Sequence, residues 1–129
     1  MDMVSSRLLI AMVPVADAER ARRFYQETLG LTFVRDDGVA LVFTGRELTL
    51  RLTRVAGFTP QPFTILGWEV DDVGASVAQL CGRGAVFERF EGLEQDERGV
   101  WTAPNGDQMA WLKDSEGNVL SLSRLSGES

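Results

Sequence analysis

The fold of this chain is decided by the stretch Val13-Pro14-Val15-Ala16-Asp17, which precedes a helix-like segment and then Leu29-Gly30-Leu31-Thr32-Phe33. The same plan restarts at Trp68-Glu69-Val70-Asp71-Asp72, which precedes a second helix-like segment and then Arg83-Gly84-Ala85-Val86-Phe87. Each copy has a capping aspartate, a helix of similar length, a glycine that ends the helix and a phenylalanine in the strand that follows. This recurrence indicates an internal duplication.

The first copy predicts one helix among four strands. Asp17 is a good N-cap, because its carboxylate can accept hydrogen bonds from first-turn N–H groups, and Gly30 supplies a left-handed end. Between them, residues recur at helical spacing: Ala21, Phe24, Thr28 and Leu29. Strands are expected at residues 8–13, 31–35, 39–44 and 47–54, with turns at Asp36-Asp37-Gly38 and Gly45-Arg46.

The second copy follows a linker, residues 55–62, in which two prolines and a glycine interrupt regular structure. Asp72 is its predicted N-cap and Gly84 ends its helix, whose core-facing residues are expected to be Val73, Val77, Leu80 and Cys81. Strands are expected at residues 63–70, 85–90, 108–113 and 118–123, with a polar loop over 91–99, a short Val100-Trp101 run and turns at Asn105-Gly106 and Ser115-Glu116-Gly117. The predicted fold class is α+β, with two β-α-β-β-β modules (about 7–54 and 63–125) in a single domain spanning residues 1–129.

Composition excludes several classes of partner. The 129 residues have a formal net charge of −6, whereas nucleic-acid binding needs a basic stripe. No apolar run reaches the length of a membrane span, and the N-terminus has no signal-peptide core. Cys81 is the only cysteine, which excludes an internal disulfide and a cysteine zinc cluster and favours a reducing, cytoplasmic location. The abundance of alanine, glycine and arginine points to a bacterial source.

Motifs from both copies match a known pattern. They are Val15-Ala16-Asp17, Phe24-Tyr25 and Leu29-Gly30-Leu31 in the first copy, and Glu69-Val70-Asp71-Asp72 and the run from Lys113 to Leu120 in the second. In these motifs the chain resembles the vicinal oxygen chelate superfamily, which includes glyoxalase I, extradiol dioxygenases, fosfomycin-modifying enzymes and the bleomycin-resistance proteins. The closing turn has Ser115 where the family usually has proline. The resemblance implies that the two sheets form a cup with the helices outside.

The resemblance also implies where a metal would bind. Metal-dependent members place one ligand, usually His, Glu or Gln, in the first and fourth strands of each module. Here those positions are Ile10 and Ile65, counted back from the capping aspartates, and Thr49 and Ser121, the centres of two Leu-x-Leu triplets; Arg51 is the other candidate in the first module. Isoleucine cannot coordinate a cation, neutral hydroxyls are poor ligands, and arginine repels one. The chain also has no histidine, so we expect neither a metal nor another cofactor.

Strand alternation predicts which side chains line the cup. Trp68 is assigned to the core, and Cys81 has no neighbouring histidine to activate it as a nucleophile. The polar loop 91–99 is either a lid over the cup or a solvated loop. The candidate ligand-binding residues are Ile10, Met12, Thr49, Arg51, Ile65, Glu69, Trp101, Met109, Trp111 and Ser121.

Each polar or aromatic candidate has two interpretations. Trp101 and Trp111 stack on a planar ligand or fill the space themselves. Glu69 binds a cation or acts as a base, or else it pairs with Arg51 or reaches solvent. Arg51 holds an anionic group or forms an ordinary salt bridge.

Three functions stay open at this stage. The leading hypothesis is a metal-free homodimer that binds a planar or cationic small molecule and sequesters an antibiotic or metabolite. The second is a lyase- or isomerase-type enzyme that uses Glu69, with or without a metal held by carboxylates outside the family pattern. The third is a degenerate, non-catalytic structural member.

Overall fold

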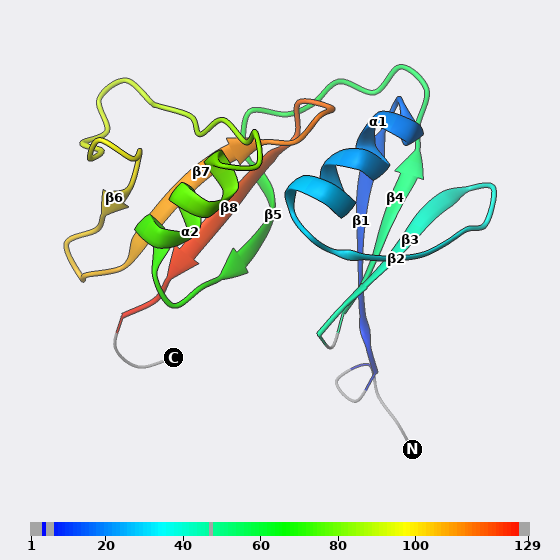
Figure 1. Ribbon diagram of the computed structural model, residues 1–129, viewed down its shortest axis with the longest axis horizontal. Helices are drawn as coiled ribbons and strands as arrows, with labels where there is room; N and C mark the ends of the chain where they lie inside the picture. The colour runs from blue at the N-terminus through cyan, green and yellow to red at the C-terminus, as the bar shows by residue number, and fades with distance from the viewer. Residues whose placement is uncertain (1–3, 5–6, 47, 127–129) are drawn as a thin grey trace. The chain divides into compact units, whose positions relative to one another are not determined.

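The chain is organised as two compact units that meet between Thr59 and Pro60 in sequence. The computed structural model describes residue 4 and residues 7–46 and 48–126. Each unit contains a four-stranded mixed sheet and a helix that follows the first strand of that sheet (Figure 1).

The first unit is a β-α-β-β-β module, as the sequence predicts. Its sheet has the order β1-β4-β3-β2, in which β1 runs parallel to β4 and the other neighbours are antiparallel. Its elements are β1 (Leu9–Val15), α1 (Ala18–Arg23), the π-helix η2 (Phe24–Thr28), β2 (Thr32–Asp36), β3 (Ala40–Gly45) and β4 (Leu48–Arg54).

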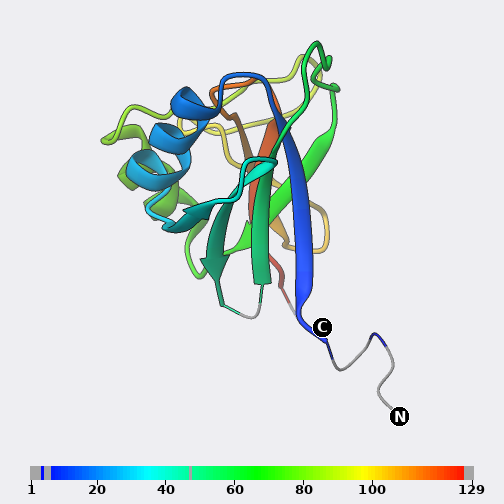
Figure 2. The same cartoon turned by 90° about the vertical axis from the view of Figure 1, so that its right-hand side faces the viewer.

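Alternation along β1 separates two faces of this sheet. Val13 and Val15 are buried, whereas Ile10 and Met12 are 57% and 66% exposed. The helix α1 lies against the buried face (Figure 2). Asp17 is the N-cap, as predicted, and accepts a hydrogen bond from the Arg20 N–H at 3.0 Å.

The first helix ends in a wider turn that the sequence pattern does not reveal. The Leu29 N–H donates to the Phe24 carbonyl at 3.0 Å, five residues back rather than four. Tyr25 is consequently the fully buried aromatic of this segment, while Phe24, at one of the predicted helical positions, is half-buried with its ring centroid 5.5 Å from that of Tyr25.

The second unit repeats the strand order of the first, which confirms the duplicated plan. Its sheet has the order β5-β8-β7-β6, again with the first and last strands parallel. Its elements are β5 (Thr64–Glu69), α2 (Val73–Cys81), β6 (Trp101–Thr102), β7 (Gln108–Lys113) and β8 (Val119–Arg124).

The helix α2 is capped and buried largely as predicted. Asp72 accepts from the Ala75 N–H at 3.0 Å, and Val73, Val77 and Leu80 are buried. The prediction for Cys81 is wrong, because this last helical residue lies at the margin of the buried stripe and is exposed. Across residues 7–46 and 48–126, no helix is long and apolar enough to cross a membrane.

The strand expected at residues 85–90 is also not formed. Two separate segments pair with the edge of β7 instead. Phe87 forms a single bridge with Leu112, and the two-residue strand β6 pairs with Gln108 and Met109. The intervening chain leaves the sheet as a loop, residues 89–100, that makes hydrogen bonds mainly within itself.

The turn that joins β7 to β8 is buried. One Asp114 carboxylate oxygen accepts from the N–H groups of Glu116 (2.8 Å) and Asn118 (2.9 Å). The other oxygen accepts from Asn118 Nδ2 at 3.0 Å. Asp114 and Asn118 are only 6% and 2% exposed, and Gly117 reverses the chain at φ 91°. The predicted turn at residues 115–117 is therefore confirmed, and the polar residues Asp114, Glu116 and Asn118 in and beside it are buried.

Candidate functional site

The candidate residues of the first unit lie together on the sheet face opposite α1. In the parallel pair β1–β4, Ile10 is the register partner of Thr49, and Met12 is the partner of Arg51. Thr49 and Arg51 alternate with the buried Leu50, so they share the exposed face of β1.

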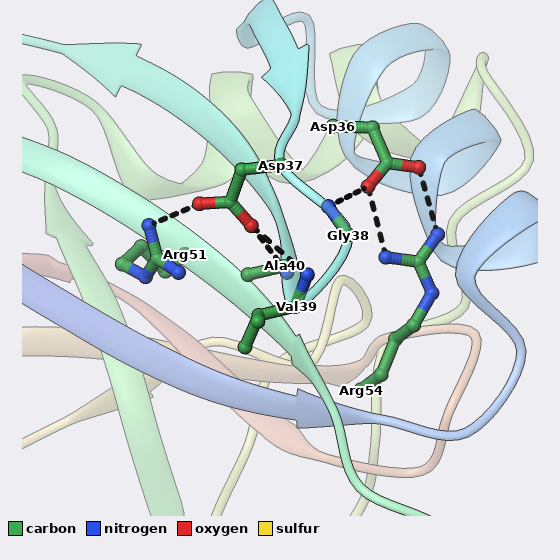
Figure 3. A network of polar contacts seen from close by, with 7 residues as sticks. All are labelled: Asp36, Asp37, Gly38, Val39, Ala40, Arg51 and Arg54. Atoms are coloured by element: carbon green, nitrogen blue, oxygen red, sulfur yellow. Dashed lines mark hydrogen bonds and ion pairs between the residues drawn. The ribbon is translucent and has the colours of Figure 1, made fainter.

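Arg51 is held by an ion pair inside the first unit. Its Nη1 atom lies 2.9 Å from Oδ2 of Asp37, whose other carboxylate oxygen accepts from the N–H groups of Val39 and Ala40 (Figure 3). This geometry matches the second interpretation of Arg51, a salt-bridged strand arginine.

A second arginine anchors the same β2–β3 turn. Both guanidinium Nη atoms of Arg54 donate to Asp36, at 2.9 and 2.8 Å (Figure 3). This bidentate hydrogen bond from Arg54, with a further bond from the Gly38 N–H, lowers the pKa of Asp36 to about 2. The N–H of Ala40 and the Arg51 guanidinium lower the pKa of Asp37 as well.

The Asp36–Arg54 pair makes a testable contribution to the pH dependence of stability. Because the pKa of Asp36 is lower in the folded chain than its ordinary 3.8, its contribution is present above that value and is lost as the pH falls toward 2. We expect carboxyl ¹³C NMR to give an Asp36 midpoint near 2, moving toward 3.8 in Arg54→Met. An unchanged midpoint in that variant would contradict the assignment of the shift to Arg54.

The candidate residues of the second unit form two rows across the face opposite α2. In the first row, Gly67 pairs with Ser121, and Ser121 pairs with Trp111. The second row runs Glu69, Ser123, Met109 and Trp101 across all four strands. Strand alternation predicts this common face correctly, because the intervening residues Ala110 and Leu112 are fully buried.

Three aromatic rings gather at the outer end of these rows. The ring centroids of Trp101 and Trp111 are 6.3 Å apart with a 35° interplanar angle. The Phe90 ring meets Trp111 edge-on at 5.4 Å. Both tryptophans remain half-buried, so part of each ring surface is accessible. Phe90 is missing from the sequence candidates because it lies on the loop that was expected to be a strand end, and only its aromatic character could have marked it.

The polar groups on this face differ in exposure: Ser121 is only 9% exposed, whereas Glu69 lies at the surface. The Glu69 side chain is exposed and forms no ion pair within the described part of the chain. The Ser121 side chain lies directly over Gly67, where a Cβ atom would overlap its Oγ. Ile65 lies at a register irregularity between Thr64 and Leu66, so Ser121 faces Gly67 and not Ile65.

The four positions at which the resemblance places metal ligands offer a poor donor set. Ile10 and Ile65 have hydrocarbon side chains, and Thr49 and Ser121 offer only neutral hydroxyls. Among the residues that the structure describes, no three His, Cys, Asp or Glu side chains are grouped so that they could hold a metal ion. The residues present therefore do not fit the metal centre of the metal-dependent members.

Comparisons with known proteins agree with this architecture. A family model described as bleomycin resistance protein-like N-terminal matches residues 7–45. The chain is similar to TnmS3, an antibiotic binding protein from Streptomyces sp. CB03234, with 30% identity, coverage of 97% of this chain and 100% of that one, and a TM-score of 0.70. No curated protein matches the chain.

Two further solved structures share the fold. One is a member of the glyoxalase/bleomycin resistance protein/dioxygenase superfamily from Sphaerobacter thermophilus DSM 20745, at 22% identity, with 95% of this chain and 100% of that one covered and a TM-score of 0.75. The other is a glyoxalase family protein from Enterococcus faecalis, at 18% identity, with 95% and 100% covered and a TM-score of 0.72.

Proposed function

Because the chain belongs to the glyoxalase/bleomycin resistance protein/dioxygenase superfamily, we propose that it binds a planar, cationic small molecule without a metal and sequesters it as an antibiotic or metabolite. The observation that supports this most directly is the pair of accessible tryptophan rings on the face that also presents Glu69. The 30% identical relative TnmS3 is an antibiotic binding protein, which supports the same class of ligand.

The dimensions of the second row favour a fused-ring ligand. Four neighbouring strands place Glu69 and Trp101 at opposite ends of a row about 14 Å long, from a strand spacing of roughly 4.8 Å. A ring system stacked on Trp101 and Trp111 can direct an amino group toward the Glu69 carboxylate. The hydroxyl of Ser123 lies between these ends and can accept or donate hydrogen bonds.

Absence of turnover and of a metal are both parts of this proposal. The absence of a metal is supported by the poor donor groups at the four ligand positions, Ile10, Thr49, Ile65 and Ser121. Elemental analysis of protein purified without chelator tests it, and one equivalent of zinc, nickel, iron or manganese per chain would overturn it. Conversion of a bound compound that is abolished in Glu69→Gln would instead favour the enzyme interpretation.

The proposal also includes a homodimer in the cytoplasm. The exposed apolar residues Leu9, Ile10 and Met12 on the edge strand β1 support self-association, and the single cysteine supports the reducing compartment. Sedimentation equilibrium tests the first point, since a particle with the 14.2 kDa mass of one chain would exclude the dimer.

Two dyes of the same shape test the role of Glu69. At pH 7, 9-aminoacridine is a planar cation, whereas acridine is mostly neutral. We expect tryptophan fluorescence titrations to show tighter binding of 9-aminoacridine, and we expect Glu69→Gln to weaken its binding about 10-fold while leaving acridine unaffected.

The matched control is Glu19→Gln, which changes the net charge by the same amount as Glu69→Gln. Glu19 lies on α1 in the first unit, on the side of the sheet that carries none of the candidate residues. If both variants weakened 9-aminoacridine binding equally, the overall charge of the protein, and not the position of Glu69, would explain the effect. Silence of the wild-type protein toward both dyes and a wider panel of planar compounds would favour the structural, non-binding interpretation.

A further inference from the structure

Resting on the proposed function, we infer that Gln95 is a positioning residue that holds Phe90, Trp101 and Trp111 in a preformed binding surface. The Gln95 side chain is half-buried inside the loop of residues 89–100. Its Oε1 atom accepts from the Phe90 N–H at 2.8 Å, and its Nε2 atom donates to the carbonyls of Glu88 (3.1 Å) and Gly99 (2.8 Å).

Each backbone partner of Gln95 adjoins one of the three aromatic residues. Phe90 is itself a partner. The Glu88 N–H donates to the Trp111 carbonyl at 2.7 Å, so the Glu88 contact fixes the loop to β7 beside that ring. Gly99 lies two residues before Trp101, and the backbone of Gln95 forms a bridge with Trp101 itself. A single amide group therefore connects the chain segments that bear all three rings.

The chemistry at this point requires an amide. A glutamine side chain has one carbonyl acceptor and two N–H donors, and the structure uses all three. A glutamate would place a second oxygen against two carbonyl oxygens, and a methionine of similar length would form none of the three bonds.

The remaining contacts of the loop do not replace Gln95. Asp96 accepts from the N–H groups of Arg98 and Val100, which closes the far end of the loop without reaching Phe90. The exposed Arg89 guanidinium donates to the carbonyls of Gln95 and Asp96 and reaches neither Glu88 nor Gly99. Without the Gln95 amide, Phe90 and the loop segment around it lose their side-chain link to Glu88 and Gly99 and can move relative to Trp101 and Trp111, which the pairing of β6 with β7 keeps together. A ligand must then order them on binding, which costs affinity.

The test compares Gln95→Met with the matched control Gln108→Met. Gln108 lies on the same sheet, but the hydrogen bonds of its side chain to described residues are long and exposed, at 3.4 Å to Thr102 and 3.5 Å from Arg124. We expect Gln95→Met to retain the far-UV circular dichroism of the wild type, to lose part of the near-UV signal as the Phe90 ring leaves Trp111, and to bind 9-aminoacridine about 10-fold more weakly. Gln108→Met should match the wild type in all three measurements.

A purely structural role predicts a different result. Gln95→Met would then unfold more easily but would keep the wild-type near-UV spectrum and dye affinity at 25 °C, which would overturn the inference.

Gln95→Glu is the second variant if Gln95→Met does not fold. At pH 7 it should show the same near-UV loss, and a wild-type near-UV spectrum of this variant would also overturn the inference. Because the near-UV spectrum needs no ligand, a wild-type protein that binds no dye would refute the proposed function and leave this measurement decisive for Gln95.

Discussion

Replacing Asp114 with alanine is expected to lower the free energy of unfolding by about 3 kcal/mol. The carboxylate accepts three hydrogen bonds in a turn that is almost completely buried. Removing it deletes the acceptor of these three hydrogen bonds in a place that water reaches poorly. Urea unfolding followed by circular dichroism measures the loss.

The chain provides a matched control in Asp37→Ala. Asp37 also accepts hydrogen bonds from two backbone N–H groups of its turn, but its side chain is 30% exposed, so water can replace it. We expect a clearly smaller loss of stability for Asp37→Ala than for Asp114→Ala. Equal losses of unfolding free energy in the two variants would show that burial does not explain the contribution of Asp114 to stability.

Replacing Trp111 with leucine is expected to weaken 9-aminoacridine binding about 30-fold, which corresponds to about 2 kcal/mol. Trp111 contacts both other rings of the aromatic cluster and lies in register with Ser121, at the centre of the proposed surface. Its loss removes stacking area and the support of the Trp101 and Phe90 rings at once. Isothermal titration calorimetry measures the change without relying on tryptophan emission.

Trp68→Leu is the control for this second experiment. Trp68 belongs to the same sheet, but alternation along β5 places it on the opposite face from Gly67 and Glu69. It should leave dye affinity unchanged, provided that far-UV circular dichroism confirms folding. Undiminished binding in Trp111→Leu would exclude this face as the ligand site.

Local signals in the sequence were sufficient to predict most of the fold. The caps Asp17 and Asp72 and the left-handed glycines Gly30 and Gly84 act through neighbouring backbone groups, so their effect can be derived without tertiary structure. The same holds for strand alternation, which assigned Trp111 and Met109 to one face and Ala110 to the other.

The features that the sequence did not reveal depend on long-range contacts. The partner of Arg51 is Asp37, on the turn between β2 and β3, and no local pattern specifies that pairing. The loss of the strand at residues 85–90 reflects competition for one edge of β7, which Phe87 shares with β6. The register shift of β5 at Ile65 likewise depends on pairing with β8, a strand more than 50 residues later in the chain.

The β2 edge of the first sheet and the β6 edge of the second, one of the two edges of each sheet, have a consequence for behaviour at high concentration. An unpaired strand edge is a template on which another chain can add a strand and begin to polymerise. The strand β6 is only two residues long, and β2 has a register irregularity between Phe33 and Arg35. Neither edge offers a long, regular row of hydrogen-bonding groups to a neighbouring molecule, so both resist growth of intermolecular sheets and protect the protein against aggregation through these strands.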